Sequence, residues 1–123
     1  MAKRFVIREL EPLEIVFNDQ VLTCLLNNDA LMLLDETFGD IQKLLESEKG
    51  KPFDLAAKLL FCGVKLHDTS FDYETAKKII TSGGLRLTLA LIDSFVENFK
   101  INATDEQLGA YAGELERLLE TLN

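Results

Sequence analysis

The residues best suited to chemistry are two cysteines, Cys24 and Cys62, and a single histidine, His67. A thiol acts as a nucleophile when a base lies within hydrogen-bond reach. His67 follows Cys62 by five residues, more than one helical turn, so such a pair would form only by chance of the fold. Both cysteines lie in apolar stretches, which is typical of free buried thiols, although the sequence leaves a disulfide open. We predict no catalytic residue and no enzyme.

Metal and cofactor sites have little support in the sequence. A closed zinc site needs four ligands, and two widely spaced cysteines with one histidine do not supply them. Asp93 and Glu97, four residues apart, share a helical face and could serve acid–base chemistry, but such a pair is more often a solvated face. Gly83-Gly84 lacks the Lys-Ser/Thr of a phosphate-binding loop. We predict no metal and no cofactor.

One short motif invites a sharper hypothesis. Asp93-Ser94-Phe95 resembles the Asp-Ser-Leu of acyl carrier proteins, which are small acidic helical domains modified on that serine. In that family the serine begins a helix, whereas Ser94 lies inside an amphipathic run that starts at Leu85. An acyl-carrier-like protein is therefore a third alternative, and a phosphopantetheine adduct on Ser94 would reveal it.

Length and charge exclude several classes of protein. A chain of 123 residues, 47% of them hydrophobic, fits one globular domain, 1–123. Its formal charge of −8 opposes binding to nucleic acid, and its basic cluster of Lys3, Arg4 and Arg8 is followed at once by Glu9 and Glu11. No apolar run reaches about 18 residues, and the start does not resemble a signal peptide. We predict neither a nucleic-acid nor a membrane partner.

The stretch from Phe53 to Leu66 predicts the central helix. Its apolar residues spread round most of a helical wheel and leave one polar stripe, formed by Asp54, Lys58 and Lys65. A helix that is apolar almost all round is buried by neighbours on several sides. The segments before and after it must supply those neighbours.

Before this helix, the pattern predicts a strand at residues 4–10 and a hairpin of Leu13–Phe17 and Val21–Leu26 that turns at Asn18-Asp19. Alternatively, Val21–Leu26 runs into the next helix. The remaining pattern predicts helices at about 30–38, 40–48, 53–66, 73–81, 85–99 and 104–122. The expected fold is mainly α. It is a compact bundle of about six helices with a short N-terminal β segment (1–26), a helical core (29–99) and a C-terminal helix (104–122), at the margin of α+β.

Helix stops and caps support these bounds. Asn27, Asn28 or Asp29 can cap the first helix, and Gly39 can end it because glycine adopts left-handed backbone angles without steric cost. Pro52 suits the first turn of the central helix. For the helix at 73–81, the expected cap is Asp72 or Ser70, and for the last helix it is a capping box at 104–107.

The order of these elements from 30 to 99 resembles the tail assembly chaperones of long-tailed bacteriophages and prophages. Those proteins begin with a short β segment. A helix ending in glycine, a leu-leu-x-x-Gly-leu helix, a thr/asp-x-glu-x-ala helix and a glycine before a long helix follow. Here LLFCGVKL and DYETAKKIITSGG match the two motifs, with Val64 in place of the final leucine. The resemblance covers about 70 of the 123 residues.

The resemblance implies a non-enzymatic role. Such chaperones bind the long helical tape measure protein in the host cytoplasm, keep it soluble, assist assembly of the tail tube around it, and are absent from the mature virion. Many also have a longer form made by ribosomal frameshifting. The partner implied is the tape measure protein, with a homo-oligomer also possible.

The residues we expect at a partner surface are Leu87, which falls outside the main apolar arc of its helix, together with Leu91, Tyr111 and Leu115. An apolar groove that accepts a helix would suit a tape measure partner. Two alternative interpretations of these residues and of the chain remain open. These residues can be core residues, and the chain can be a small cytosolic adaptor or regulatory domain that binds another protein through the same helices.

Overall fold

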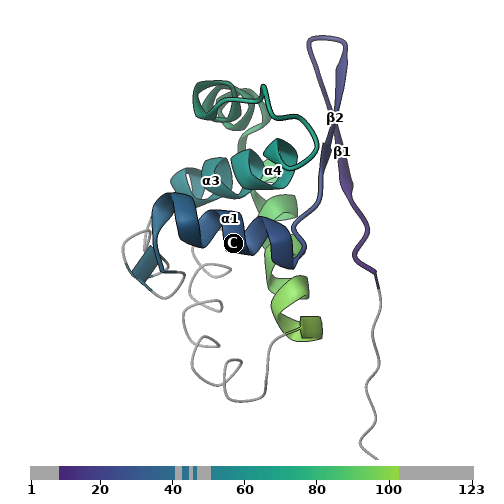
Figure 1. The fold of residues 1–123 in the computed structure, drawn as a ribbon. Helices are drawn as coiled ribbons and strands as arrows, with labels where there is room; N and C mark the ends of the chain where they lie inside the picture. The colour runs from purple at the N-terminus through teal and green to yellow at the C-terminus, as the bar shows by residue number, and fades with distance from the viewer. Residues whose placement is uncertain (1–8, 41–42, 45, 47–50, 103–123) are drawn as a thin grey trace, which may run out of the picture.

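The computed structural model describes residues 9–40, 43–44, 46 and 51–102, with side chains described as far as residue 98. Figure 1 shows a hairpin beside a group of helices. The elements, in chain order, are β1 (Leu13–Phe17), β2 (Gln20–Cys24), α1 (Asn28–Phe38), α3 (Pro52–Lys65) and α4 (Tyr73–Asn102).

The prediction of a bundle of about six helices is wrong, although the fold is mostly helical as expected. The described part of the chain forms three helices and a two-stranded sheet. The predicted helices at 73–81 and 85–99 belong to one element, α4, because the chain bends at Gly84 and continues. The predicted helix at 104–122, most of the one at 40–48 and residues 4–8 of the first predicted strand lie outside the described residues. Glu9 and Leu10, at the end of that predicted strand, are not in a strand. Within 40–48, the described residues Lys43, Leu44 and Glu46 are helical, as predicted.

The predicted hairpin is confirmed. β1 and β2 pair antiparallel, with Val16 opposite Val21 and Phe17 opposite Gln20. Asn18 and Asp19 both have positive φ angles, 50° and 67°, as a two-residue type I′ turn requires. Asparagine and aspartate tolerate this region better than other residues with side chains. The turn residues therefore set the register that places alternate side chains on the helices.

Several predicted helix caps and stops are confirmed, whereas the ends predicted at about 81 and 99 are not, since α4 runs to Asn102 with only Gly84 non-helical. Asn27 caps α1, its side chain accepting a hydrogen bond of 3.0 Å from the Ala30 N–H. Gly39 ends α1 at a φ of 100°. Pro52 occupies the first turn of α3. Asp72, one of the two expected caps, accepts a hydrogen bond of 2.7 Å from the Thr75 N–H at the start of α4.

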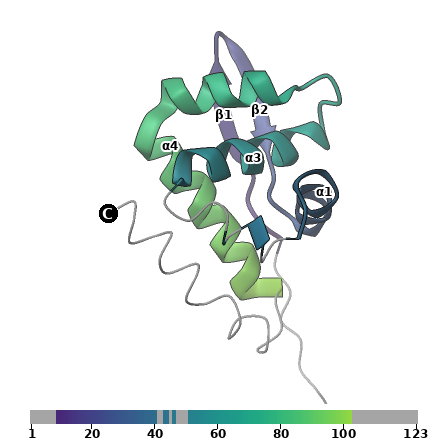
Figure 2. The same ribbon diagram turned by 90° about the vertical axis from the view of Figure 1, so that its left-hand side faces the viewer.

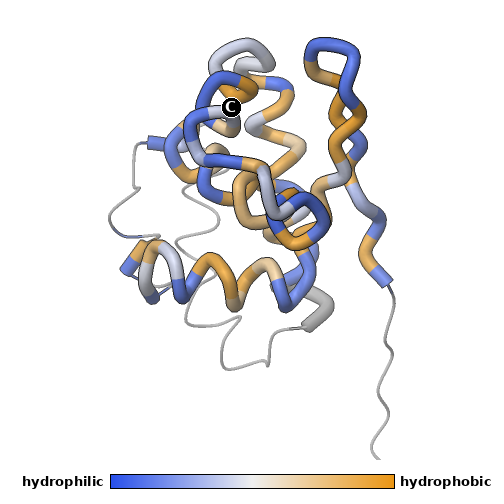
Figure 3. Tube along the Cα trace, turned by 45° about the horizontal axis from the view of Figure 1, so that its top comes forward, coloured by the Kyte–Doolittle hydropathy of each residue, from blue (hydrophilic) through white to orange (hydrophobic). Residues whose placement is uncertain are grey.

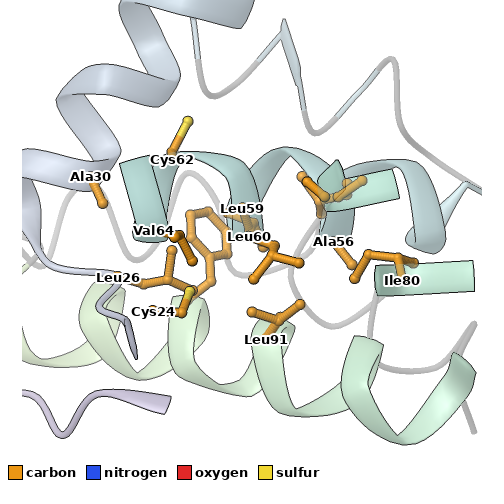
Figure 4. Close-up of a cluster of buried hydrophobic side chains, with 14 of the residues drawn as sticks. Cys24, Leu26, Ala30, Ala56, Leu59, Leu60, Cys62, Val64, Ile80 and Leu91 are labelled. Carbon is orange, nitrogen blue, oxygen red and sulfur yellow. The ribbon is translucent and has the colours of Figure 1, made fainter. Parts of the chain in front are cut away.

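Helix α3 is central, as its pattern predicts. It packs against α1, α4 and β2, and Figure 4 shows its side chains in the cluster that these elements share. Asp54 is exposed and Lys58 and Lys65 are half-buried, so the predicted polar stripe exists. The residues that α3 buries are Pro52, Leu55, Ala56, Ala57, Leu59, Leu60, Cys62, Gly63 and Val64.

The end of β2 and the chain after it lie directly against α3. The Leu25 N–H donates a hydrogen bond of 3.1 Å to the Gly63 carbonyl. A Cβ atom added at Gly63 would overlap the Cys24 Sγ and lie 3.1 Å from the Leu26 Cδ2. Glycine is therefore required at this point of α3 by close approach.

A buried side chain from the far end of α4 secures the same region. The Asn98 Nδ2 donates a hydrogen bond of 2.8 Å to the Leu26 carbonyl, and Asn98 is fully buried. A buried carbonyl left without a donor would cost about 1–3 kcal/mol. Asn98 thus joins the chain after the hairpin to the second half of α4.

Helix α4 consists of two halves that run in different directions, as Figure 2 shows. Gly84 lies between them with φ 65° and ψ −147°, a conformation essentially restricted to glycine. Near the bend, the buried Oγ1 of Thr88 lacks a hydrogen-bond partner in the described structure, which is unfavourable. A helical threonine commonly donates to the carbonyl four residues earlier, as Thr81 does to Lys77 at 2.9 Å. For Thr88 that carbonyl belongs to Gly84, whose ψ angle turns it out of the helical direction.

The Tyr73–Asn98 part of α4 is long and apolar enough to cross a membrane by length and composition alone. A core helix of a globular protein can pass the same test. Here Gly84 divides the segment, and Leu91, Ile92 and Phe95 are fully buried. We interpret it as a core helix, and the absence of a membrane partner stays a prediction.

Replacing Gly63 by alanine should destabilise the protein by about 1–3 kcal/mol, because the added methyl group overpacks the contact with Cys24. In an ordinary helix interior the same change stabilises by about 0.5–1 kcal/mol. Urea unfolding of Gly63→Ala measures the sign. The double variant Gly63→Ala/Cys24→Ala should be more stable than the sum of the single changes predicts, and a Gly63→Ala protein more stable than the parent would contradict the close approach.

Thr88→Val should raise stability by about 1 kcal/mol, because it removes an unsatisfied buried hydroxyl and keeps the branched shape. Thr81→Val is the matched control, since its exposed hydroxyl has an acceptor and its loss should change stability little. Thermal or urea unfolding decides the point. Destabilisation by Thr88→Val would mean that the hydroxyl has an acceptor.

Candidate functional site

The two cysteines are free and buried, as expected. Burial raises the pKa of each thiol from its ordinary value of 9.0 to about 12, with proximity to Cys62 adding to the effect at Cys24. Figure 4 shows the two side chains on different sides of the cluster, with the Cys62 sulfur directed away from Cys24. His67 is exposed beyond the end of α3. Thiols of this kind are packing groups, since the thiolate is the reactive form.

Ser94 does not occupy the position of a carrier serine. It is half-buried inside the second half of α4, ten residues after the bend at Gly84. Asp93 and Glu97 on the same helix are exposed. These three residues share a surface with a distant segment, which the sequence did not reveal.

That surface is a hollow of about 500 Å³ between the second half of α4 and the segment that leads into β1. We call it the acidic groove. Of the described residues, four carboxylates and no Lys, Arg or His line it, while apolar side chains line most of the rest. In Figure 1 the chain that leads into β1 runs on the side of the molecule where the hairpin lies. The lining residues are Glu9, Leu10, Glu11, Pro12 and Leu13 on one wall, and Ala90, Asp93, Ser94 and Glu97 on the other.

A second cluster brings together three aromatic rings from three helices. Phe38, Phe61 and Tyr73 lie with ring centroids 5.3–6.1 Å apart, two of the pairs edge to face. A lysine Nζ lies 5.0–5.5 Å from the centroid of each ring. Such contacts add about 0.5–1 kcal/mol at exposed sites. The cluster joins the end of α1 to α3 and to the start of α4.

The lysines of this cluster also have local partners. Lys65 donates to the Thr69 and Phe71 carbonyls at 3.0 and 3.3 Å, and Lys77 pairs with Glu74 at 2.8 Å. The hydrogen bond to Glu74 is the main reason that the pKa of Lys77 is raised. We therefore assign this cluster a structural role.

The residues predicted for a partner surface are placed differently from one another. Leu87 is half-buried, packs against the core and would contact a Cβ added at Gly83. Leu91 is fully buried, so it offers no surface in this structure. Tyr111 and Leu115 lie outside the described residues. Near Leu87, Leu85 is 47% exposed, which makes it the more accessible apolar side chain after the bend.

Other apolar side chains are exposed at the hairpin. Val16 and Val21, paired across the strands, are 69% and 63% exposed. Figure 3 shows apolar residues along the hairpin, which projects beside the helices. Within the described ranges, histidine, cysteine and carboxylate groups do not gather in a set of three or more that could hold a metal ion.

The native thiols should react slowly with an aromatic disulfide reagent at pH 8, because both are buried and protonated. In urea, both should react at the rate of free cysteine. The raised pKa also means that the thiols favour the folded state below pH 9 and that this contribution is lost as the pH rises toward 12. Rapid native labelling of either thiol would contradict this assignment.

Comparison of the chain with protein-family models gives no match, and neither the curated proteins nor the solved structures show a significant similarity to it.

Proposed function

We propose that this chain is a non-enzymatic tail assembly chaperone of a long-tailed bacteriophage or prophage. In this role it binds the tape measure protein in the host cytoplasm and assists assembly of the tail tube. The observation that carries the proposal is the order and spacing of the sequence segments between 30 and 99, which resembles that family.

The positions of these segments in the fold are compatible with the proposal. The stretch LLFCGVKL lies in α3, the central helix, and DYETAKKIITSGG covers the cap and first half of α4. Two glycines of the pattern are required by their backbone conformations. Gly39 and Gly84 both have positive φ angles, where other residues are strained.

A chaperone for a long helical protein needs an apolar surface that accepts a helix. Apolar side chains exposed around the bend of α4 supply one candidate, formed by Leu85 and the half-buried Leu87. Tyr111 and Leu115 stay part of the proposed surface from the sequence, while the burial of Leu91 removes it.

Co-expression with the very long, helix-rich protein that this proposal expects to be encoded just downstream tests the function. Size-exclusion chromatography with light scattering should show several copies of this chain on one partner, and the partner should be insoluble alone. If the chain elutes alone and the partner's solubility is unchanged, the chaperone proposal fails. An adaptor bound to a different cellular protein then becomes the better reading, and an acyl-carrier-like role would need a phosphopantetheine adduct on Ser94.

The surface itself is tested by Leu85→Asp and Leu87→Asp. Each should weaken binding of the tape measure protein at least tenfold. Leu85→Asp should change stability by less than about 1 kcal/mol, because the side chain is already half exposed. Ile92→Asp is the core control and should unfold the domain, since it buries an unpaired charge.

Folding is checked by circular dichroism before binding is compared. If both leucine variants fold and still bind as the parent does, the contact surface lies elsewhere.

A further inference from the structure

The four carboxylates of the acidic groove are not balanced by positive charge from the described residues that line it. Glu9 and Glu11 lie on one wall and Asp93 and Glu97 on the other, and none of the described residues that line the space between them is cationic. Carboxylates gathered in a hollow with low-dielectric walls raise the local concentration of positive charge. A cationic ligand is therefore favoured there.

The distribution of carboxylates and apolar groups in the groove indicates which class of ligand fits it. Its carboxylates are spread over two walls, and in the described structure they do not form a set suited to a metal ion. Apolar groups, including Leu10, Pro12 and Leu13, line the groove between them. A peptide that combines cationic and apolar side chains suits such a surface better than an ion does.

The same chain contains a segment of that chemistry. Residues 1–8, Met-Ala-Lys-Arg-Phe-Val-Ile-Arg, have three cations and no acid, and Phe5, Val6 and Ile7 separate the cations into two groups. We call this stretch the basic segment. Its three positive charges face four carboxylates in the groove, which makes the two surfaces complementary in charge and in apolar character.

We propose that the basic segment of one copy binds in the acidic groove of a second copy, and that the exchange is reciprocal. The segment joins the groove wall directly, since Arg8 precedes Glu9. Two copies with their grooves facing each other can therefore exchange segments around a twofold axis, which gives a closed dimer. This proposal is independent of the function proposed above.

Binding of the segment in its own groove is the less favourable arrangement. The chain would have to reverse direction immediately before Glu9, within Phe5-Val6-Ile7-Arg8. Tight turns favour Gly, Pro, Asn, Asp and Ser, and these four residues include none of them. β-Branched and aromatic residues favour an extended chain instead, and an extended stretch of eight residues spans up to about 26 Å.

Charge reversal on each side tests the exchange by light scattering and sedimentation. The parent chain should be a dimer that weakens as salt is raised. Lys3→Glu/Arg4→Glu/Arg8→Glu should weaken dimerisation at least tenfold, and so should Asp93→Lys/Glu97→Lys. Combining all five changes in one chain should restore part of the lost affinity, because the two new lysines at 93 and 97 can then pair with the new carboxylates of the segment, while Glu9 and Glu11 stay acidic.

A matched control carries the same charge change on another surface. Asp35→Lys/Glu36→Lys alters two exposed residues of α1 and should leave the dimer intact. Circular dichroism confirms that each variant folds. The proposal is overturned if the parent chain is monomeric at every accessible concentration. It is also overturned if the dimer survives both charge reversals, or if the variant that carries all five changes stays as monomeric as the singly reversed variants.

Discussion

The close approach of the chain after β2 to α3 is the contact on which the arrangement depends. Only a residue without a side chain at position 63 lets Cys24 and Leu26 pack directly on the helix, with the Leu25 N–H bonded to the Gly63 carbonyl. This contact fixes the hairpin beside the helices, and the start of α1 follows from it three residues later. Because α3 is apolar almost all round, each surrounding element contributes mainly by covering one of its sides.

Gly84, which is not helical, divides α4 into two helical halves, and both halves contribute to the core around α3. The first half of α4 contributes Ala76, Ile79 and Ile80 to the core, and the second half contributes residues from Leu91 onward. A straight helix of this length could contact α3 over only part of its surface. The unsatisfied Thr88 hydroxyl is the local cost of a geometry that increases apolar burial, and burying one large aliphatic side chain outweighs it.

Features set by neighbouring residues could be predicted from the sequence. The hairpin and its turn, the caps at Asn27 and Asp72, the stop at Gly39 and the central position of α3 all depend on local propensity and periodicity. The number of helices could not be predicted from the sequence. Gly83-Gly84 is a typical helix stop, and Gly84 does interrupt the helical geometry, but the two halves of α4 join there without the loop that the prediction placed between them.

Features that join distant segments could not be predicted either. The acidic groove needs Glu9 and Asp93 to line one hollow, and the aromatic cluster needs Phe38 beside Tyr73, yet neither pair has a sequence signal. Asp93 and Glu97 alone look like an ordinary solvated face.

The hydrogen bond between Asn98 and Leu26 has a consequence for how the domain opens. Its two residues are separated by 72 positions, and both lie in the core region. Fraying of the end of α4 would expose the Leu26 carbonyl, and detachment of the hairpin would remove the acceptor of the Asn98 amide. Opening at either end is therefore thermodynamically coupled to opening at the other, so the described domain should behave as one cooperative unit instead of a helical body with an independent hairpin.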